Sequence, residues 1–240
     1  MQEIFETEIR IVPSLADAQG RLAIPGVFSL FMDMAAEHAR LLGLGFDDMK
    51  ARDLFWLTVK TKIRISRLPR MGEAVLLRTW PEKPGTLRCC RSYEMLGGGG
   101  LLCAGKTEWA VLNFAENRLV RIDGIYPEDL RIPERTAVEE PFSRIPDDFD
   151  GIEPCAEYRV RSTDIDVGGH MNNAAYVRAL AGSFSLDEWD SLPKSCVEVL
   201  FRAPCHEGDR ILLQLRRTEG RAEIRGAREK ETAILVRMEV

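Results

Sequence analysis

The chain has 240 residues, a formal net charge of −5 and a sequence pI of about 5.4. This length fits one large domain or two small ones, and the acidic balance argues against a generic nucleic-acid binder, which carries a basic excess. The N-terminal residues MQEIFETEIRIV do not resemble a secretory signal, and no apolar run approaches the ~18 residues that span a bilayer. We therefore expect a cytoplasmic protein that neither binds nucleic acid nor inserts into a membrane.

Six cysteines are present, and none of them forms a CxxC pair. Their spacing suggests neither a zinc site nor a disulfide framework, so we expect free thiols in a reducing compartment and no metal or cofactor. The six are Cys89, Cys90, Cys103, Cys155, Cys196 and Cys205.

The first half of the chain predicts one strand, one helix and a series of strands. A strand is expected at Glu3–Val12, and apolar residues at helical spacing predict a helix over Val27–Leu42. Alternating runs separated by Gly- and Pro-rich turns then predict an antiparallel meander. These strands are expected at Leu54–Ser66, Ala74–Pro81, Leu87–Leu96, Leu101–Phe114 and Arg118–Ile122.

The second half repeats this plan after a Pro- and acid-rich stretch, Val138–Pro154, that is typical of a linker. A helix is expected over Asn173–Trp189. The expected strands are Ala156–Ser162, Ser195–Ala203, Arg210–Arg217, Ala222–Arg228 and Ala233–Glu239. This organisation predicts an N-terminal domain at 1–137, a linker at 138–154 and a C-terminal domain at 155–240.

Two pairs of segments indicate an internal duplication. DAQGRL (Asp17–Leu22) precedes the first helix as DVGGHM (Asp166–Met171) precedes the second, and Ile63–Glu73 resembles Val199–Asp209. We therefore predict an α+β fold with two halves, each a long helix wrapped by an antiparallel sheet. This architecture is a tandem, or double, hotdog.

The stretch TDIDVGGHMNN combines carboxylates, glycines and a histidine ahead of the second helix. Asp164 and Asp166 alternate, which predicts that they share a face of a strand end. The amides of Gly168 and Gly169 could hold an oxyanion at a helix N-terminus. Asp166 could act as general base or nucleophile, and His170 could orient the water or thioester or carry a proton.

A purely structural role for the same residues is equally simple. In that reading the aspartate caps a turn, the glycines permit it, and the histidine packs against the helix. Asn172 is a candidate N-cap of that helix and a candidate substrate contact. Cys205 is a weak candidate nucleophile, since a buried small apolar residue is the more common role of such a cysteine.

The stretch DIDVGGHMNNAAYVRAL resembles the D-x-D-x-N-x-H-x-N-N-x-x-Y signature of acyl-ACP thioesterases, the double-hotdog enzymes of plant plastids and bacteria. The segments His38–Gly45, Phe55–Glu73 and Glu108–Ile122 are similar to further motifs of that family, in the same order. The resemblance implies hydrolysis of fatty acyl thioesters on acyl carrier protein (ACP), with Asp166 and His170 as catalytic residues.

Two positions depart from the family pattern. Gly168 stands where the family has an asparagine, and Pro204 stands where it has a glutamate, with Glu207 three residues further on. An acyl-CoA thioesterase and a non-hydrolytic acyl- or ACP-binding module therefore remain alternatives. The sequence does not indicate the preferred chain length, and a homodimer stays an open option for its assembly.

The resemblance implies an acyl-chain pocket between the helix and the sheet of the first half. Candidate lining residues are Phe31, Met34 and Trp56, although ordinary core positions are as common for such side chains. Lys60, Lys62 and Arg64 alternate along one strand and predict a basic outer face. Such a face is usually solvated, but it could contribute to the docking of an acidic carrier protein.

Overall fold

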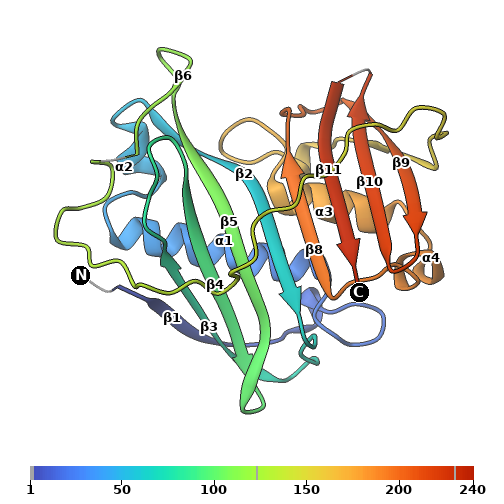
Figure 1. The fold of residues 1–240 in the computed structure, drawn as a ribbon, viewed down its shortest axis with the longest axis horizontal. Helices are drawn as coiled ribbons and strands as arrows, with labels where there is room; N and C mark the ends of the chain where they lie inside the picture. Colours follow the sequence, from blue (N-terminus) through green and yellow to red (C-terminus); the bar gives the residue numbers. More distant parts are fainter. Residues whose placement is uncertain (1–2, 123, 230) are drawn as a thin grey trace. The chain divides into compact units, whose positions relative to one another are not determined.

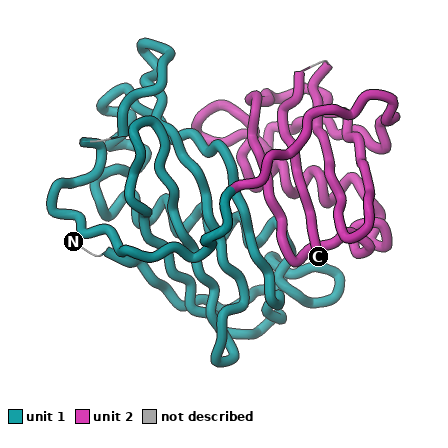
Figure 2. The backbone as a smooth tube through the Cα atoms, viewed as in Figure 1, with its two compact units in different colours: residues 1–141 teal, residues 142–240 magenta. Residues whose placement is uncertain are grey.

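The structure is a computed structural model that describes residues 3–122, 124–229 and 231–240. It divides the chain into two compact units, unit 1 at Met1–Pro141 and unit 2 at Phe142–Val240 (Figure 2). This division falls within the stretch 138–154 that the sequence suggests as a linker. The units are described one at a time.

Unit 1 is a five-stranded antiparallel sheet in the order β1-β3-β4-β5-β2, with a long helix, α1, on one face (Figure 1). A short strand, β6, pairs with the end of β5. The elements in chain order are β1 (Phe5–Arg10), the 3-10 turn η1 (Pro13–Leu15), α1 (Ile24–Leu41), α2 (Phe46–Lys50), β2 (Leu54–Ile65), β3 (Ala74–Pro81), β4 (Cys89–Gly97), β5 (Gly100–Asn113) and β6 (Arg118–Leu119).

Unit 2 repeats this topology. Its sheet has the order β7-β9-β10-β11-β8, in which each strand takes the place of its counterpart in unit 1. The elements are β7 (Ala156–Arg159), η2 (Ser162–Asp164), α3 (Asn173–Gly182), α4 (Leu186–Asp190), β8 (Cys196–Phe201), β9 (Arg210–Thr218), β10 (Arg221–Arg228) and β11 (Glu231–Glu239). The predicted duplication and the tandem hotdog architecture are confirmed.

The predicted helix over Asn173–Trp189 is wrong in one respect, because it is two helices. α3 ends at Gly182, and α4 begins after Ser185. The backbone amide of Glu188 donates to Ser185 Oγ at 3.3 Å, while the Glu188 carboxylate accepts from the Ser185 amide at 2.9 Å. This reciprocal capping box starts a new helix, and the sequence SLDE is its signature. The equivalent short helix of unit 1, α2, was also absent from the prediction.

The α1 helix packs on the centre of its sheet through an aromatic contact that requires a glycine, Gly105, in the strand beneath it. Phe31 of α1 stacks on Tyr93 of β4, with ring centroids 4.8 Å apart. A Cβ atom at Gly105 of β5 would lie 2.6 Å from the Phe31 ring. Glycine at this position therefore allows the aromatic pair to lie flat against the sheet.

The predicted basic outer face of unit 1 is largely covered by the chain itself. Lys62 is buried, and its Nζ donates to the carbonyl oxygen of Pro141. Lys106 Nζ donates to the carbonyl of Glu140 at 3.2 Å, and Arg64 forms an ion pair with the Glu140 carboxylate at 3.1 Å. These basic side chains anchor the segment that leaves unit 1, so the idea of a free docking face is corrected for Lys62 and Arg64.

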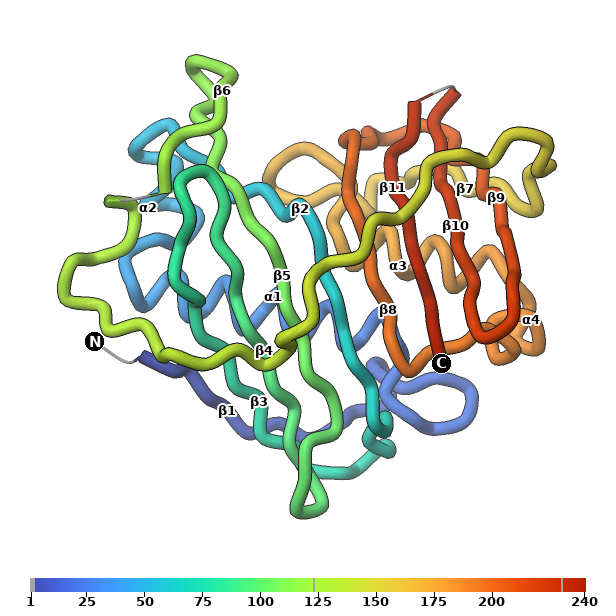
Figure 3. The backbone as a smooth tube through the Cα atoms, in the orientation of Figure 1, coloured from blue at the N-terminus to red at the C-terminus, as the bar shows by residue number. Residues whose placement is uncertain are grey.

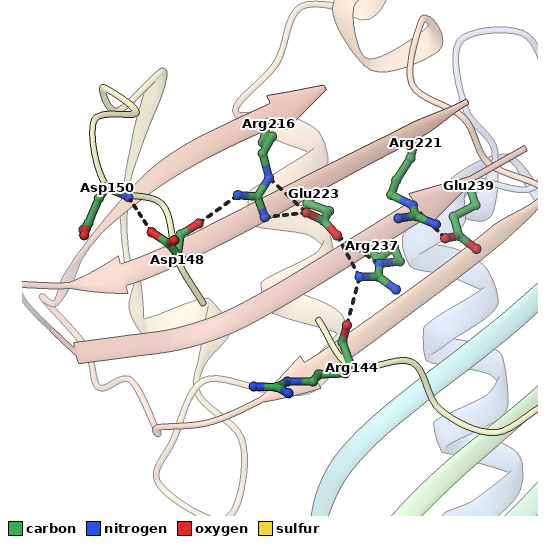
Figure 4. Close-up of polar contacts among 8 residues, drawn as sticks. All are labelled: Arg144, Asp148, Asp150, Arg216, Arg221, Glu223, Arg237 and Glu239. Carbon is green, nitrogen blue, oxygen red and sulfur yellow. Dashed lines mark hydrogen bonds and ion pairs between the residues drawn. The ribbon is translucent and has the colours of Figure 1, made fainter. Parts of the chain in front are cut away.

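The segment that enters unit 2 is held in the same way, along the sheet face opposite α3 (Figure 3). Glu223 of β10 lies between Arg216 of β9 and Arg237 of β11, its direct cross-strand neighbours (Figure 4). The two guanidinium groups also donate to the carbonyls of Asp148 at 2.8 Å and Arg144 at 2.9 Å. The stretch called a linker is thus docked in both units rather than freely solvated.

Glu73 lies in the turn before β3, and the hydrogen bonds of its carboxylate should stabilise the fold in a way that depends on pH. Its carboxylate accepts from the Arg67 guanidinium at 2.6 Å and from the Arg70 amide at 2.9 Å. The Arg67 hydrogen bond is the main reason that its pKa falls from 4.5 to about 2. Because the pKa is lower in the folded state, this contribution is present above pH 4.5 and is lost as the pH falls towards 2.

We therefore expect Glu73→Gln to lower the free energy of unfolding at pH 7, and the difference from wild type to shrink between pH 4.5 and pH 2. Urea titrations across this pH range measure the effect. Glu116→Gln is the control, since Glu116 is half-exposed and pairs with Arg118, two residues away. A pH-independent difference for Glu73→Gln would contradict the prediction.

Candidate active site

A tight turn ahead of α3 carries the predicted catalytic pair. The amide of Asp166 donates to the carbonyl of His170 at 3.0 Å, and the Gly169 amide donates to the Asp166 carbonyl at 3.0 Å. Ile165 and Met171 flank this turn as an antiparallel bridge. Gly169 has a φ of +77°, a conformation that glycine adopts without strain. The turn therefore places Asp166 opposite His170 at its closed end.

Asp164 and Asp166 do not share a face, contrary to the sequence-based expectation. The strand β7 already ends at Arg159, and Asp164 closes the 3-10 turn that follows. Asp164 is only 7% exposed, and its Oδ2 accepts from the Tyr158 hydroxyl at 2.8 Å and the Arg161 amide at 2.9 Å. Asp166 is exposed. Only the second carboxylate is accessible to a substrate.

The two glycine amides proposed for an oxyanion are engaged inside the turn. The Gly168 amide donates to Asp166 Oδ1 at 2.8 Å, and the Gly169 amide donates to the Asp166 carbonyl. Neither amide is free, which corrects the expectation of open donors at this point. The hydrogen bond from the Gly168 amide orients the Asp166 carboxylate. A side chain that accepts from the amide two residues ahead forms an Asx-turn.

Unit 1 contains the same turn, in which Asp17 and Arg21 occupy the positions of Asp166 and His170. The amide of Asp17 donates to the carbonyl of Arg21 at 2.7 Å, and Gly20 takes the place of Gly169 with a φ of +69°. The side chains of Asp17 and Arg21 form an ion pair at 3.0 Å. Because the backbone hydrogen bonds are equivalent, the positions of Asp166 and His170 also lie on one side of their turn.

A second histidine, His206, lies against His170. The two imidazole rings have centroids 5.0 Å apart and meet edge to face at 64°. The Met171 amide donates to the Cys205 carbonyl at 2.8 Å, which ties the turn before α3 to the turn between β8 and β9. Both histidines are exposed. The sequence analysis does not identify His206 as a site residue.

The duplication contains the signal that could have identified His206. In the repeat of Ile63–Glu73 by Val199–Asp209, His206 aligns with Arg70. Arg70 forms an antiparallel bridge with Arg21, the counterpart of His170. Unit 2 therefore has histidine at both positions where unit 1 has arginine.

Asp209 anchors the turn that presents His206. Its Oδ2 accepts from the His206 amide at 2.8 Å and from Arg228 at 2.9 Å, and it lies 3.9 Å from His206 Nδ1. Burial acts to raise the pKa of this carboxyl, but the His206 amide and the Arg228 guanidinium outweigh it and lower the pKa. A carboxylate thus stands beside the second imidazole.

Cys205 is adjacent to this site but does not face solvent. Its exposure is 0%. Burial is the main cause that raises the pKa of its thiol. A neutral buried thiol is a poor nucleophile, because the thiolate is the reactive form. The geometry therefore speaks against the nucleophilic role considered for Cys205.

The remaining candidate residues have structural partners. Asn172 Oδ1 accepts from the Ala174 amide at 2.8 Å, so its expected N-cap role is confirmed. Phe31 and Met34 are buried on α1 of unit 1. Trp56 donates from Nε1 to the Leu44 carbonyl at 3.1 Å and packs against Trp109.

Within the described residues, no group of three or more His, Cys, Asp or Glu side chains is arranged to hold a metal ion. No described helix is both long and apolar enough to cross a membrane. All six cysteines are free thiols.

Comparison with known proteins gives a consistent result over most of the chain. The model of the acyl-ACP thioesterase N-terminal domain matches residues 2–128, and the model of the acyl-ACP thioesterase C-terminal domain matches residues 152–235. A chloroplastic acyl-[acyl-carrier-protein] hydrolase of Cuphea viscosissima is 25% identical over 84% of this chain and 56% of its own length. The chain spans about half the length of the curated relatives it matches.

Two solved structures share the fold. An acyl-ACP thioesterase from Bacteroides thetaiotaomicron superposes with a TM-score of 0.89 at 20% identity, over 99% of this chain and 97% of its own. A 12:0-ACP thioesterase from Umbellularia californica superposes with a TM-score of 0.83 at 18% identity, over 100% of this chain and 97% of its own. With both family models matched in order on two repeated hotdog units, the chain belongs to the acyl-ACP thioesterase family.

Proposed function

We propose that this protein hydrolyses fatty acyl-ACP thioesters at the turn before α3, with Asp166 and His170 as its catalytic residues. The observation that carries the proposal is the juxtaposition of an oriented, exposed carboxylate with a pair of contacting imidazoles. The equivalent turn of unit 1 has an aspartate and two arginines instead. Of these two equivalent turns, therefore, only the one in unit 2 has histidine side chains, the most common proton-transfer groups of general acid–base catalysis.

The chemistry requires a proton to move from water to the departing thiol. Water attacks the thioester carbonyl carbon, and Asp166 accepts its proton while the C–O bond forms. The C–S bond then breaks, and the proton is returned to the sulfur, which leaves as the thiol of the carrier. In this proposal His170 orients the water or carries that proton, and its position on the same side of the turn as Asp166 supports the role.

His206 compensates for the two positions that depart from the family pattern. Gly168 has no side chain that could orient the water, and Pro204 has no carboxylate. The His206 ring contacts the His170 ring, and the Asp209 carboxylate lies 3.9 Å from His206 Nδ1. We assign His206 as a positioning residue that holds the His170 ring.

The substrate and surroundings follow from the same proposal. The acyl chain lies between α1 and the sheet of unit 1, near Phe31, Met34 and Trp56, and ACP is the partner that delivers it. The family match and the named acyl-ACP hydrolases among its relatives support this choice. Six free thiols favour a reducing compartment, and we propose the cytoplasm.

A non-hydrolytic acyl-ACP-binding role is the second candidate. It is favoured by the engagement of both glycine amides within the turn. An acyl-CoA thioesterase uses the same chemistry on a different carrier. Acyl-ACP and acyl-CoA substrates of equal chain length, compared under matched conditions, separate the three possibilities.

The first prediction concerns the catalytic pair. We expect Asp166→Asn and His170→Ala each to lower single-turnover hydrolysis of acyl-ACP by about 100-fold or more, because proton transfer is lost. Asparagine can still accept the Gly168 amide, so the turn is retained. Asp17→Asn, in the equivalent turn of unit 1, is the matched control and keeps full activity. No wild-type turnover at any chain length, or full activity of Asp166→Asn, would overturn the assignment.

The second prediction concerns His206. We expect His206→Ala to reduce kcat about tenfold with little change in KM, since it disturbs the orientation of His170 rather than substrate binding. His206→Gln, which keeps a side-chain hydrogen-bonding group, should restore part of kcat. Arg70→Ala is the control from unit 1. Equal kcat values for wild type and His206→Ala would remove the positioning role.

The third prediction concerns Cys205. Because its thiol is buried and protonated, we expect Cys205→Ala to keep most of kcat and iodoacetamide to leave Cys205 unmodified in the folded protein. Mass spectrometry of the treated protein gives the measurement, and the exposed Cys155 serves as an internal reference that is labelled. A folded Cys205→Ala variant without turnover would contradict this prediction and support Cys205 as the nucleophile.

A further inference from the structure

The helix-facing side of β4 carries a buried cation in the middle of unit 1. Side chains alternate along a strand, so Cys89, Arg91, Tyr93 and Met95 face the same way. Tyr93 stacks on Phe31 of α1, and Arg91 contacts His38 of α1, which identifies this side as the one against the helix. All four side chains are buried. A guanidinium group therefore lies in the layer that would hold an apolar acyl chain.

Arg91 has neutral partners only. Its Nη1 lies 2.9 Å from His38 Nδ1 and 3.3 Å from Thr79 Oγ1. Arg91 is 5% exposed, and within the described part of the chain it forms no ion pair with a carboxylate. Glu82, an acidic residue close in sequence, accepts from Ser92 instead. Burying a cation without a neighbouring anion costs several kcal/mol, so an anion bound beside Arg91 would be strongly stabilised.

The groups around Arg91 are also donors without acceptors. The Tyr93 hydroxyl and the Trp109 indole N–H are buried, and neither makes a hydrogen bond of normal geometry with another described residue. Thr107 and Trp109 are the polar side chains near the Tyr93 hydroxyl. Trp109 of β5 is the cross-strand neighbour of Cys89, and Thr107 is that of Arg91. Arg91 uses one nitrogen in the hydrogen bonds described above, although a guanidinium has five N–H donors. Buried donors such as the Tyr93 hydroxyl and the Trp109 N–H are normally satisfied by an oxygen acceptor.

From this arrangement we propose that Arg91, with the Tyr93 hydroxyl, forms a carboxylate-binding subsite between α1 and the sheet of unit 1. The ligand class is an acyl chain that carries a second, terminal carboxylate, the ω-carboxyacyl group. A carboxylate fits the planar guanidinium in a two-pronged manner and supplies the missing negative charge. The inference rests on the proposed acyl-thioester function for the purpose of the pocket, but its ligand chemistry can be measured without catalysis.

The test is equilibrium binding of three probes of equal length to the whole protein. Monomethyl dodecanedioate carries one ester and one carboxylate, dimethyl dodecanedioate carries no carboxylate, and methyl ω-hydroxydodecanoate replaces the carboxylate by a hydroxyl. We expect the monomethyl probe to bind about tenfold more tightly than the other two, as one charged hydrogen bond supplies. Equal affinity of the three probes would overturn the proposal, and so would preference for the hydroxyl probe.

Variants connect this preference to Arg91. Arg91→Met removes the charge at similar volume and should abolish the preference, whereas Arg91→Lys keeps the charge, loses the planar fork and should retain part of it. Arg78→Met is the control, because Arg78 is partly exposed on β3 and pairs with Glu6. If Arg91→Met does not fold, the Arg91→Lys series decides. An unchanged preference in a folded Arg91 variant would refute the subsite.

The outcome can be separated from that of the proposed function. Binding is measured on wild type and on Asp166→Asn, in which hydrolysis is disabled. A carboxylate preference in binding, together with no hydrolysis of acyl-ACP by the wild type at any chain length, would refute the proposed function and keep the subsite. Fast hydrolysis of plain acyl-ACP, together with no carboxylate preference in binding, would keep the proposed function and refute the subsite.

Discussion

One backbone hydrogen bond, repeated in both units, brings the candidate site together. The Met171 amide donates to the Cys205 carbonyl, as the Leu22 amide donates to the Pro69 carbonyl in unit 1, each at 2.8 Å. This bond joins the turn before the long helix to the turn between two strands. It brings residues 170 and 206 into contact although 36 positions separate them. Neither turn could present a histidine pair alone.

The two units use this frame for different purposes. In unit 1 the frame holds Arg21 and Arg70, and Arg21 is neutralised by Asp17. In unit 2 both arginines are replaced by histidines, and the aspartate is left with the amide of Gly168. An ion pair thus closes the turn of unit 1, whereas the carboxylate and the imidazoles at the turn of unit 2 are exposed. Unit 1 has instead a buried cation between its helix and its sheet, Arg91, whose described partners are neutral.

Around the unit boundary, basic side chains hold the covering segment in place instead of forming an open binding surface. Basic residues such as Lys62 alternate on a sheet face, which is a pattern typical of solvated surfaces. In the structure Lys62 binds a carbonyl of the covering segment, and the Arg216–Glu223–Arg237 ladder does the same in unit 2 (Figure 4). An extended segment has unpaired carbonyls, and the long basic side chains satisfy them.

The amino-acid sequence by itself determined the tandem α+β fold, the order of its strands along the chain, and the turn with Asp166 and His170. These features depend on local periodicity, on turn residues such as Gly169, and on motifs that survive duplication. Tertiary structure alone decided that Asp164 is buried, that the Gly168 amide is engaged, and that His206 contacts His170. It also decided that Arg91 points towards α1, where its described partners are His38 and Thr79. Such facts depend on hydrogen bonds and contacts between segments distant in the chain, or on the exact end of a strand, and periodicity carries no information about either.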